Sequence, residues 1–374
     1  MQIIGKKVLS FIFLSILCFV SNNIIFGDSN TLSFTFDEIG AFADGLTIID
    51  CKIIDNELAF ITEFPSGYFS IYNISNPANC FKINSYYFSH PHELEVDMEN
   101  ELAFIIHQNG LSILEISNFS HLQVLSTYTS FTYGTFFEKV GSLLFIGVES
   151  EGLHVVNISN PLLPTFLGNW TDPESGIGPI YINDQYAFVA TRLPVVGGGV
   201  TPIALKVLNI SDPANITFVS VAETGTNYGG GIPNANVNNL LYLADFEEGF
   251  KILNFTNPLE VKFIGEYFDG GIAATIQIIN ETKAFVADDI DGLEVLDCSN
   301  PYQPIEIASH QLQWRAYRLA IVENRIYIGT LGGGVRILAI TSNTQSANNS
   351  ILILSCLILL PIYLIYKNKI NKSN

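Results

Sequence analysis

A short segment that ends in a turn recurs along the chain, and it constrains the fold more than any other feature. Five copies are "SIYNISNP" (70–77), "LHVVNISNP" (153–161), "LKVLNISDP" (205–213), "FKILNFTNP" (250–258) and "LEVLDCSNP" (293–301). The turn position recurs in steps of 42, 42, 52, 45 and 43 residues, at Asn76, Asn118, Asn160, Asp212, Asn257 and Asn300. A period in the low forties is typical of β-propeller blades.

Each repeat predicts four strands. In 93–128 these are "ELEVD", "ELAFII", "GLSILEI" and "QVLSTY". The second and third strands are apolar on both alternating faces, as expected where neighbouring blades cover each face. Asn before Pro disfavours a helix, Pro presets a tight turn, and Ser or Thr can bond it. The recurring segment therefore predicts the turn from the third strand to the fourth.

The number of repeats predicts an all-β, seven-bladed β-propeller over 29–340, with four strands in each blade. A seventh copy, "RIYIGTLGGGVRILAI" (325–340), lacks the turn and a following fourth strand. The segment "LSFTFDEIG" (32–40) precedes the first blade and has the right length to replace that strand. We therefore predict that 29–40 closes the ring and covers an exposed sheet edge. The alternative is a six-bladed ring with an extra hairpin.

Three segments resemble the LVIVD-repeat family: "GLHVVNISNPLLPTFLG" (152–168), "AFVADDIDG" (284–292) and "GLEVLDCSNPYQP" (292–304). The resemblance covers almost all of 29–340 and implies a seven-bladed propeller on a secreted or surface protein. It implies little about activity. The fourth repeat departs from the pattern through an insertion, and the seventh lacks the turn.

The two ends of the chain predict a membrane protein. Lys6 and Lys7 precede an apolar run, which indicates a signal peptide over 1–27. Near the other end, 351–366 is uncharged, apolar and followed by three lysines. This pattern predicts a transmembrane helix, with a stalk at 341–350 and a cytoplasmic tail at 367–374. The propeller would then lie outside a cell membrane that the chain crosses once. A buried terminal helix is the alternative.

The charge of the predicted extracellular part limits its partners. Residues 29–349 hold 35 acidic and 12 basic residues, a net charge of −23. Such a surface repels nucleic acid and anionic lipid headgroups, but it is compatible with cations or basic partners. Its three cysteines, Cys51, Cys80 and Cys298, provide no disulfide framework. A Cys51–Cys80 pair is the alternative.

Two candidate metal sites fall in loops that share the predicted outward face. The first is Asp288, Asp289 and Asp291, because clustered carboxylates suit Ca²⁺. Other acidic residues lie in equivalent loops and Arg192 alone opposes them, so a solvated acidic rim is the alternative. The second candidate is a transition-metal site formed by three histidines. The alternative is that the loops carrying these histidines do not meet and form no site. These histidines are His90, His92 and His310.

The insertion in the fourth blade predicts a ligand-binding surface, because long irregular loops are often functional. The insertion is "RLPVVGGGVTPI" (192–203), and the predicted surface also includes "TGTNYGGGIPNAN" (224–236), a loop on the same face. The candidate residues are Arg192, Pro194, Gly197, Gly198, Gly199, Tyr228 and Gly230.

Sequons predict glycosylation at four positions: Asn169, Asn215, Asn280 and Asn348. Four further sequons share one repeat column whose polar side chain is expected to bond the turn instead. They are Asn73, Asn157, Asn209 and Asn254.

No segment matches a nucleophile elbow or a phosphate-binding loop before a helix. The sequence therefore favours a membrane-anchored binding module for an extracellular protein or glycan, without catalysis. Two alternatives are a metal-dependent hydrolase or lyase at the outward mouth of the channel, and a structural protein of the cell envelope. Propellers host all three functions, so the fold does not decide among them.

Overall fold

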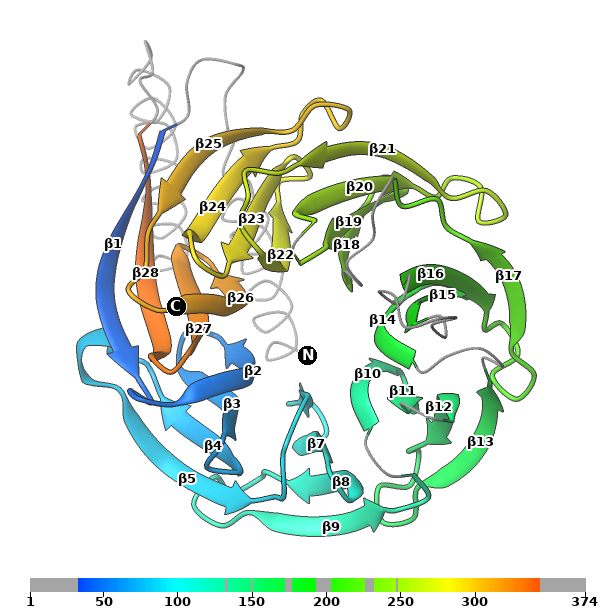
Figure 1. Ribbon diagram of the computed structural model, residues 1–374. Helices are drawn as coiled ribbons and strands as arrows, with labels where there is room; N and C mark the ends of the chain where they lie inside the picture. The colour runs from blue at the N-terminus through cyan, green and yellow to red at the C-terminus, as the bar shows by residue number, and fades with distance from the viewer. Residues whose placement is uncertain are drawn as a thin grey trace, which may run out of the picture. The chain divides into compact units, whose positions relative to one another are not determined.

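Seven four-stranded antiparallel sheets surround a central axis in the computed structural model of the chain (Figure 1). The structure describes residues 33–343, except 132–133, 149–150, 172–176, 193–202, 226–231 and 247. Within this part, Thr35–Thr341 forms one compact unit. The prediction of an all-β, seven-bladed propeller with four-stranded blades is confirmed, and the six-bladed alternative is excluded.

The blades follow one another along the chain. Blade one comprises β2 (Thr47–Ile54), β3 (Leu58–Phe64), β4 (Tyr68–Asn73) and β5 (Phe81–Tyr87), with a 3-10 turn at Pro77–Asn79. Blade two comprises β6 (Leu94–Asp97), β7 (Leu102–His107), β8 (Gly110–Glu115) and β9 (Gln123–Tyr128). Blade three comprises β10 (Gly134–Val140), β11 (Leu143–Val148), β12 (Gly152–Asn157) and β13 (Thr165–Trp170).

The remaining blades repeat this order. Blade four comprises β14 (Ile177–Asn183), β15 (Tyr186–Arg192), β16 (Ile203–Asn209) and β17 (Thr217–Val221). Blade five comprises β18 (Ile232–Val237), β19 (Leu240–Ala244), β20 (Phe250–Asn254) and β21 (Lys262–Tyr267). Blade six comprises β22 (Ala273–Ile279), β23 (Lys283–Asp288), β24 (Gly292–Asp297) and β25 (Ile305–His310). Blade seven comprises β26 (Arg315–Val322), β27 (Arg325–Leu331), β28 (Gly334–Asn343) and β1 (Ser33–Phe42).

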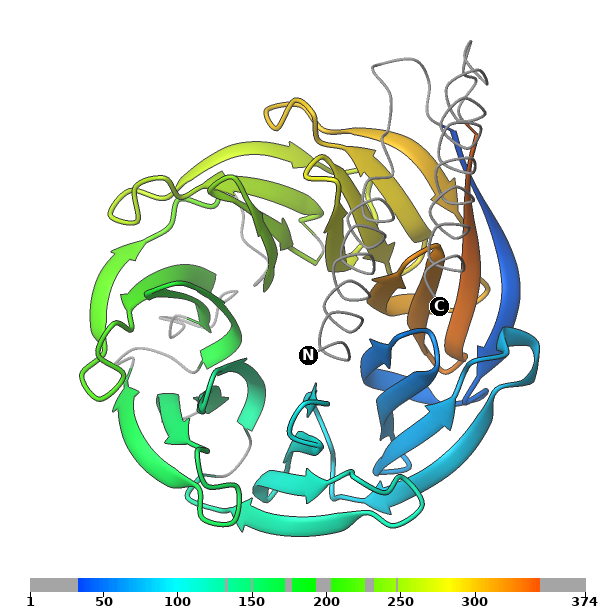
Figure 2. The same ribbon diagram turned by 180° about the vertical axis from the view of Figure 1, so that it is seen from behind.

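Blade seven takes its outer strand from the other end of the chain. Its strand order is β1-β28-β27-β26, and both views show β1 running beside β28 at the rim (Figures 1 and 2). Arg336 on β28 donates to Asp44 at 2.9 Å, lies 3.6 Å from Glu38, and stacks 3.8 Å over the Trp314 ring. The contacts with Glu38 and Asp44 join β28 to the segment that contains β1, whereas Trp314 immediately precedes β26 of the same blade.

The recurring segment forms the predicted turn through its side chains. The first polar residue accepts a backbone N–H two residues further on, at 2.9–3.2 Å, in Asn73, Asn157, Asn209, Asn254 and Asp297. The residue immediately before the proline position repeats this bond at 3.0–3.2 Å, in Asn76, Asn118, Asn160, Asp212, Asn257 and Asn300. Each turn is therefore fixed by local bonds that compete with helix formation.

The hydrophobic core lies between blades. Phe104 and Ile106 of blade two, for example, belong to one buried cluster with Leu144 and Ile146 of blade three. Corresponding clusters join blades one and two, three and four, four and five, five and six, and, through Tyr327, seven and one. This packing leaves the first strand of each blade nearest the axis (Figure 1). The axis-facing side chains of these strands form the wall of the central channel.

The ends of the ring differ slightly from the predicted boundaries. The closing strand β1 spans Ser33–Phe42 rather than 29–40, and β28 continues to Asn343, three residues into the predicted stalk. The predicted signal peptide (1–27), transmembrane helix (351–366) and tail (367–374) lie outside the described residues. Among the residues that are described, no helix is long and apolar enough to cross a membrane. Cys51, Cys80 and Cys298 are free thiols, so the alternative Cys51–Cys80 pair is absent.

Candidate functional site

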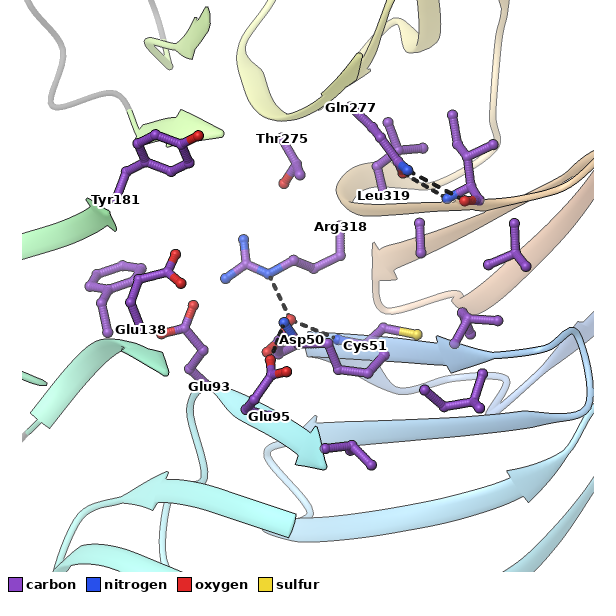
Figure 3. Close-up of a pocket in the computed structure, with 18 of the residues that line it drawn as sticks. Asp50, Cys51, Glu93, Glu95, Glu138, Tyr181, Thr275, Gln277, Arg318 and Leu319 are labelled. Atoms are coloured by element: carbon purple, nitrogen blue, oxygen red, sulfur yellow. Dashed lines mark hydrogen bonds and ion pairs between the residues drawn. The ribbon is translucent and has the colours of Figure 1, made fainter. Parts of the chain in front are cut away.

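A cavity of about 440 Å³ occupies the central channel. Six inner strands contribute to its wall: β2, β6, β10, β14, β22 and β26. Figure 3 shows acidic, basic and aromatic side chains from different blades facing one another across it. The polar lining residues are Asp50, Lys52, Glu93, Glu95, Glu138, Tyr181, Thr275, Gln277 and Arg318.

The repeat itself places these side chains. Steps of 43 residues lead from Lys52 to Glu95, then to Glu138 and Tyr181, so the four occupy equivalent places in successive blades. Asp50 and Glu93 are related by the same step and lie two residues earlier in the sequence, Asp50 on β2 and Glu93 immediately before β6. Because side chains two apart on a strand share a face, both positions point to the axis.

Two ion pairs lie in the wall of the cavity, and Figure 3 draws the one between Arg318 and Asp50 as a dashed line. The Lys52 ammonium lies 3.0 Å from the Glu95 carboxylate. Nε of Arg318 lies 3.7 Å from Asp50 Oδ1. Burial opposes the charge of Lys52, but Asp50 and Glu95 outweigh it and raise its pKa. Both basic side chains of the cavity wall are thus matched by a carboxylate.

Some axial side chains also join one blade to the next. Asp50 of blade one accepts a hydrogen bond from the Leu94 backbone N–H of blade two at 3.0 Å. Glu93 of blade two accepts one from the Phe137 N–H of blade three at 2.5 Å. Gln277 of blade six accepts one from the Ile321 N–H of blade seven at 2.7 Å. These side chains therefore stabilise the ring as well as lining its centre.

Two carboxyl groups of the cavity titrate near neutral pH. Burial, reinforced by the nearby charge of Asp50, raises the pKa of Glu93 to about 8. Burial, together with Glu95 and Asp50, outweighs the opposing charge of Lys52 and raises the pKa of Glu138 to about 7. Burial and Glu138 together raise the pKa of the neighbouring Tyr181 to about 12. These carboxyl groups can donate a hydrogen bond to a ligand when protonated, or pair with a cation once they ionise.

A second acidic group lies in blade six and the loop before it. Carboxylate oxygens of Asp269, Asp288 and Glu294 lie within 4.8 Å of one another. Asp288 and Glu294 are buried and Asp269 is exposed. Burial raises the pKa of Asp288, and burial with an Asp269 hydrogen bond raises that of Glu294 to about 9. Oxygen ligands at this spacing could hold a hard cation.

The predicted calcium ligands are not brought together as a set. Asp288 joins Asp269 and Glu294, whereas the Asp289 carboxylate forms a two-point pair with the Arg315 guanidinium. Asp291 lies in the turn between β23 and β24 and is partly exposed. Asp289 therefore already has a cationic partner. The third carboxylate beside Asp288 and Glu294 comes from Asp269, not from the predicted Asp291.

The predicted histidine set does not gather either. In the described part of the chain, no metal-ligating group of three includes His90, His92 or His310. The exposed His90 ring lies 3.1 Å from Gln108, and burial lowers the pKa of His92. The His310 ring packs edge-on against Phe36 of the closing strand.

The expectation that Arg192 alone opposes the acidic rim is wrong. Glu63 pairs with Lys82 at 3.1 Å, and Asp245 with Lys251 at 2.6 Å. Arg315 pairs with Asp289, as described above. The expectation failed because Lys82 reaches the rim from the outer strand of its blade, and Lys251 and Arg315 from other strands.

The predicted ligand-binding residues fall almost entirely outside the described part. Arg192 ends β15 and pairs in register with Ile203, so the insertion joins the second and third strands of blade four. The Arg192 side chain, Pro194, Gly197, Gly198, Gly199, Tyr228 and Gly230 are not among the described features. Of the predicted glycosylation sites, Asn169, Asn215 and Asn280 are exposed, and Asn348 lies outside the described residues.

Comparison with known proteins agrees with the repeat architecture. The LVIVD repeat matches residues 96–130, 140–172 and 270–311, which fall in blades two, three and six. The chain contains LVIVD repeats. No curated protein matches the chain. The fold is also similar to that in the crystal structure of the computationally designed Ika8 protein. That similarity has a TM-score of 0.58 at 10% identity and covers 81% of this chain and 99% of the other, so it concerns the fold alone.

Sequence reasoning missed the residues that line the central cavity, because it searched for sites in the loops and not in the first strand of each blade. The signal was nevertheless present, since Lys52, Glu95, Glu138 and Tyr181 recur at a constant spacing of 43 residues. Their residue types differ between repeats, whereas the turn residues stay the same. Aligning the repeats and comparing the first strands would have revealed a column that holds three charged residues and Tyr181.

Proposed function

We propose that the chain is a membrane-anchored extracellular binding module that takes its ligand, without catalysis, into the mouth of the central channel. The observation that carries this proposal is the axial cavity, where six inner strands present charged and aromatic side chains around about 440 Å³. Ligand sites are typically concave, largely preformed and equipped with a few convergent polar groups. The β-propeller repeat fold is consistent with an interaction module.

The proposed location rests on the sequence. The apolar segment 351–366 is followed by Lys367, Lys369 and Lys372, as in a helix that stops in a membrane with its tail in the cytoplasm. We place the propeller outside the cell membrane after removal of the signal peptide 1–27. In this location, exposed Asn169, Asn215 and Asn280 would carry glycans if the cell modifies its sequons.

The proposed ligand is an extracellular protein or glycan, part of which enters the channel. The net charge of −23 over residues 29–349 disfavours nucleic acid and favours neutral or basic partners. In the sequence, segment 192–203 connects β15 to β16 of blade four, and segment 224–236 follows β17. We propose that they contact the ligand outside the channel.

A binding screen with a channel variant tests this function. Purified full-length protein in detergent would be screened against a glycan array and extracellular proteins, and hits measured by isothermal titration calorimetry. Tyr181→Ala is expected to weaken a true hit, because it removes an aromatic wall of the cavity. Glu266→Gln, on the outer strand of blade five, is the matched control and should leave binding unchanged. Equal binding by both variants would contradict a channel site.

A further inference from the structure

The charges of the channel are not balanced. Four carboxyl groups line the cavity, and only Lys52 and Arg318 oppose them. Lys52 is paired with Glu95 and Arg318 with Asp50. Glu93 and Glu138 therefore form no ion pair with a described residue, although Lys52 attracts both of them at longer range. A ligand that enters the cavity meets an excess of acidic groups rather than an excess of basic ones.

Glu138 is the least satisfied of these groups. Glu93 at least accepts the backbone N–H of Phe137. Glu138 makes neither a hydrogen bond nor an ion pair with any residue that the structure describes. Figure 3 places its carboxyl group beside that of Glu93, with Tyr181 on one side and Arg318 across the cavity. An unpaired carboxyl group in a partly desolvated cavity gains from a ligand that supplies a positive charge or a donor.

We propose that the channel binds a small organic cation whose primary ammonium group pairs with Glu138 and Glu93. This inference rests on the proposed binding function and specifies the chemistry of the group that enters the channel. Phe136 and Tyr181 line the same cavity, and aromatic faces attract ammonium groups. An anion would have to displace a carboxylate from Lys52 or Arg318.

The geometry favours an organic cation over a metal ion. Within the described residues, the only three acidic or metal-ligating groups with atoms within 4.8 Å of one another are Asp269, Asp288 and Glu294. The channel carboxylates are thus too dispersed to form a compact cage of oxygen ligands. A cavity of about 440 Å³ instead accommodates a molecule of several heavy atoms.

Binding of a cation in this cavity should depend on pH. Titratable or charged side chains facing Glu138 come from β2 (Asp50 and Lys52), the residue before β6 (Glu93), β6 (Glu95), β14 (Tyr181) and β26 (Arg318). Burial keeps Glu93 and Glu138 partly protonated at neutral pH, with pKa values of about 8 and about 7. An ammonium ligand stabilises their ionised forms, so its binding should release protons and become tighter as the pH rises.

Calorimetry on the full-length protein tests the inference with four probes: 1,4-diaminobutane, 1,4-butanediol, butanoate and Ca²⁺. We expect the diamine to bind, the diol and butanoate to fail, and the affinity for the diamine to increase between about pH 6 and about pH 8. Heats measured in buffers of different ionisation enthalpy should report proton release. Glu138→Gln should weaken diamine binding about tenfold or more, about 1.4 kcal/mol. The control Glu266→Gln should not change it.

The outcomes separate this inference from the proposed function. If the diol or butanoate binds in the channel and the diamine does not, the inference of a cationic ligand is overturned, whereas the proposed binding function is retained. If Ca²⁺ alone binds there, the organic class is overturned. If no probe, protein or glycan binds, both proposals fail. If Glu138→Gln misfolds, the diamine affinity of Glu93→Gln and the pH dependence of diamine binding to the unmodified protein test the same inference.

Discussion

Replacing Glu294 by Gln should stabilise the propeller at neutral pH. Glu294 on β24 is 4% exposed, and burial with its Asp269 hydrogen bond raises its pKa from 4.5 to about 9. At pH 7 the side chain is therefore protonated in the folded protein and ionised in the unfolded one. Folding must bind a proton, which costs about 1.36 kcal/mol for each pH unit above the unfolded pKa.

The expected size follows from that difference. Between pH 4.5 and pH 7 the cost reaches about 3 kcal/mol, and it continues to grow until the pH passes the folded pKa of about 9. Glutamine has a similar shape, carries hydrogen-bond donors and does not ionise. Glu294→Gln should therefore raise the free energy of unfolding by up to about 3 kcal/mol at pH 7, and by almost nothing near pH 4.5.

Thermal unfolding from pH 4.5 to pH 9, in the presence of a chelator, measures this effect. The two proteins should melt together at the acidic end, and the unmodified protein should fall progressively below the variant as the pH rises. Glu266→Gln, an exposed carboxyl on β21, should follow the unmodified protein. The reasoning is refuted if Glu294→Gln melts at or below the unmodified protein at pH 7.

A calcium titration extends the same experiment. If Asp269, Asp288 and Glu294 hold a cation, millimolar Ca²⁺ should raise the melting temperature more than sodium chloride of equal ionic strength. Glu294→Gln should remove that surplus. Equal shifts from both salts would indicate simple screening.

Three further predictions concern acid stability, ring closure and topology. Burial lowers the pKa of His107 from 6.5 to about 4, so stability should be lost as the pH falls from 6.5 towards 4, by up to about 3 kcal/mol; His107→Gln should reduce that loss in acid melts. Arg336→Met should destabilise blade seven by roughly 1 to 3 kcal/mol and loosen β1, because it removes the contact with the Trp314 ring and those with Asp44 and Glu38 of the β1 segment. Hydrogen exchange should show faster exchange of β1 amides than in blade three, and unchanged exchange would contradict this role. Protease added to intact cells should remove the propeller and spare the tail, and a protected propeller would contradict the proposed topology.

The fold could be predicted because local rules determine its repeating parts. The turn after each third strand depends on residues within a few positions of one another, such as Asn76 with Ala78. The number of repeats then predicted the number of blades. Because blade seven lacks a fourth strand of its own in the sequence, the segment before blade one was predicted to supply it. The structure places β1 in that outer position, displaced by a few residues from the predicted range.

The candidate sites could be predicted only in part, because they depend on contacts between distant segments. Asp288 was identified as a potential ligand, but its neighbours are Asp269, from the previous loop, and Glu294, from the next strand. Arg315 reaches Asp289 from the following blade, 26 residues away. Sequence distance does not reveal which long side chain bends towards which carboxylate. The spacing within a repeat predicts position, but not pairing.

The contrast between constant and variable columns of the repeat explains where a single site can arise in a ring of similar blades. The turn column keeps Asn or Asp in six copies, because every blade needs the same hydrogen bond. The axial column changes from Lys52 to Glu95, Glu138 and Tyr181, although its members occupy equivalent positions. A uniform column of like charges would repel itself around the axis. A varied column instead pairs some charges, leaves Glu138 unpaired, and so gives the symmetric channel one asymmetric place for a ligand.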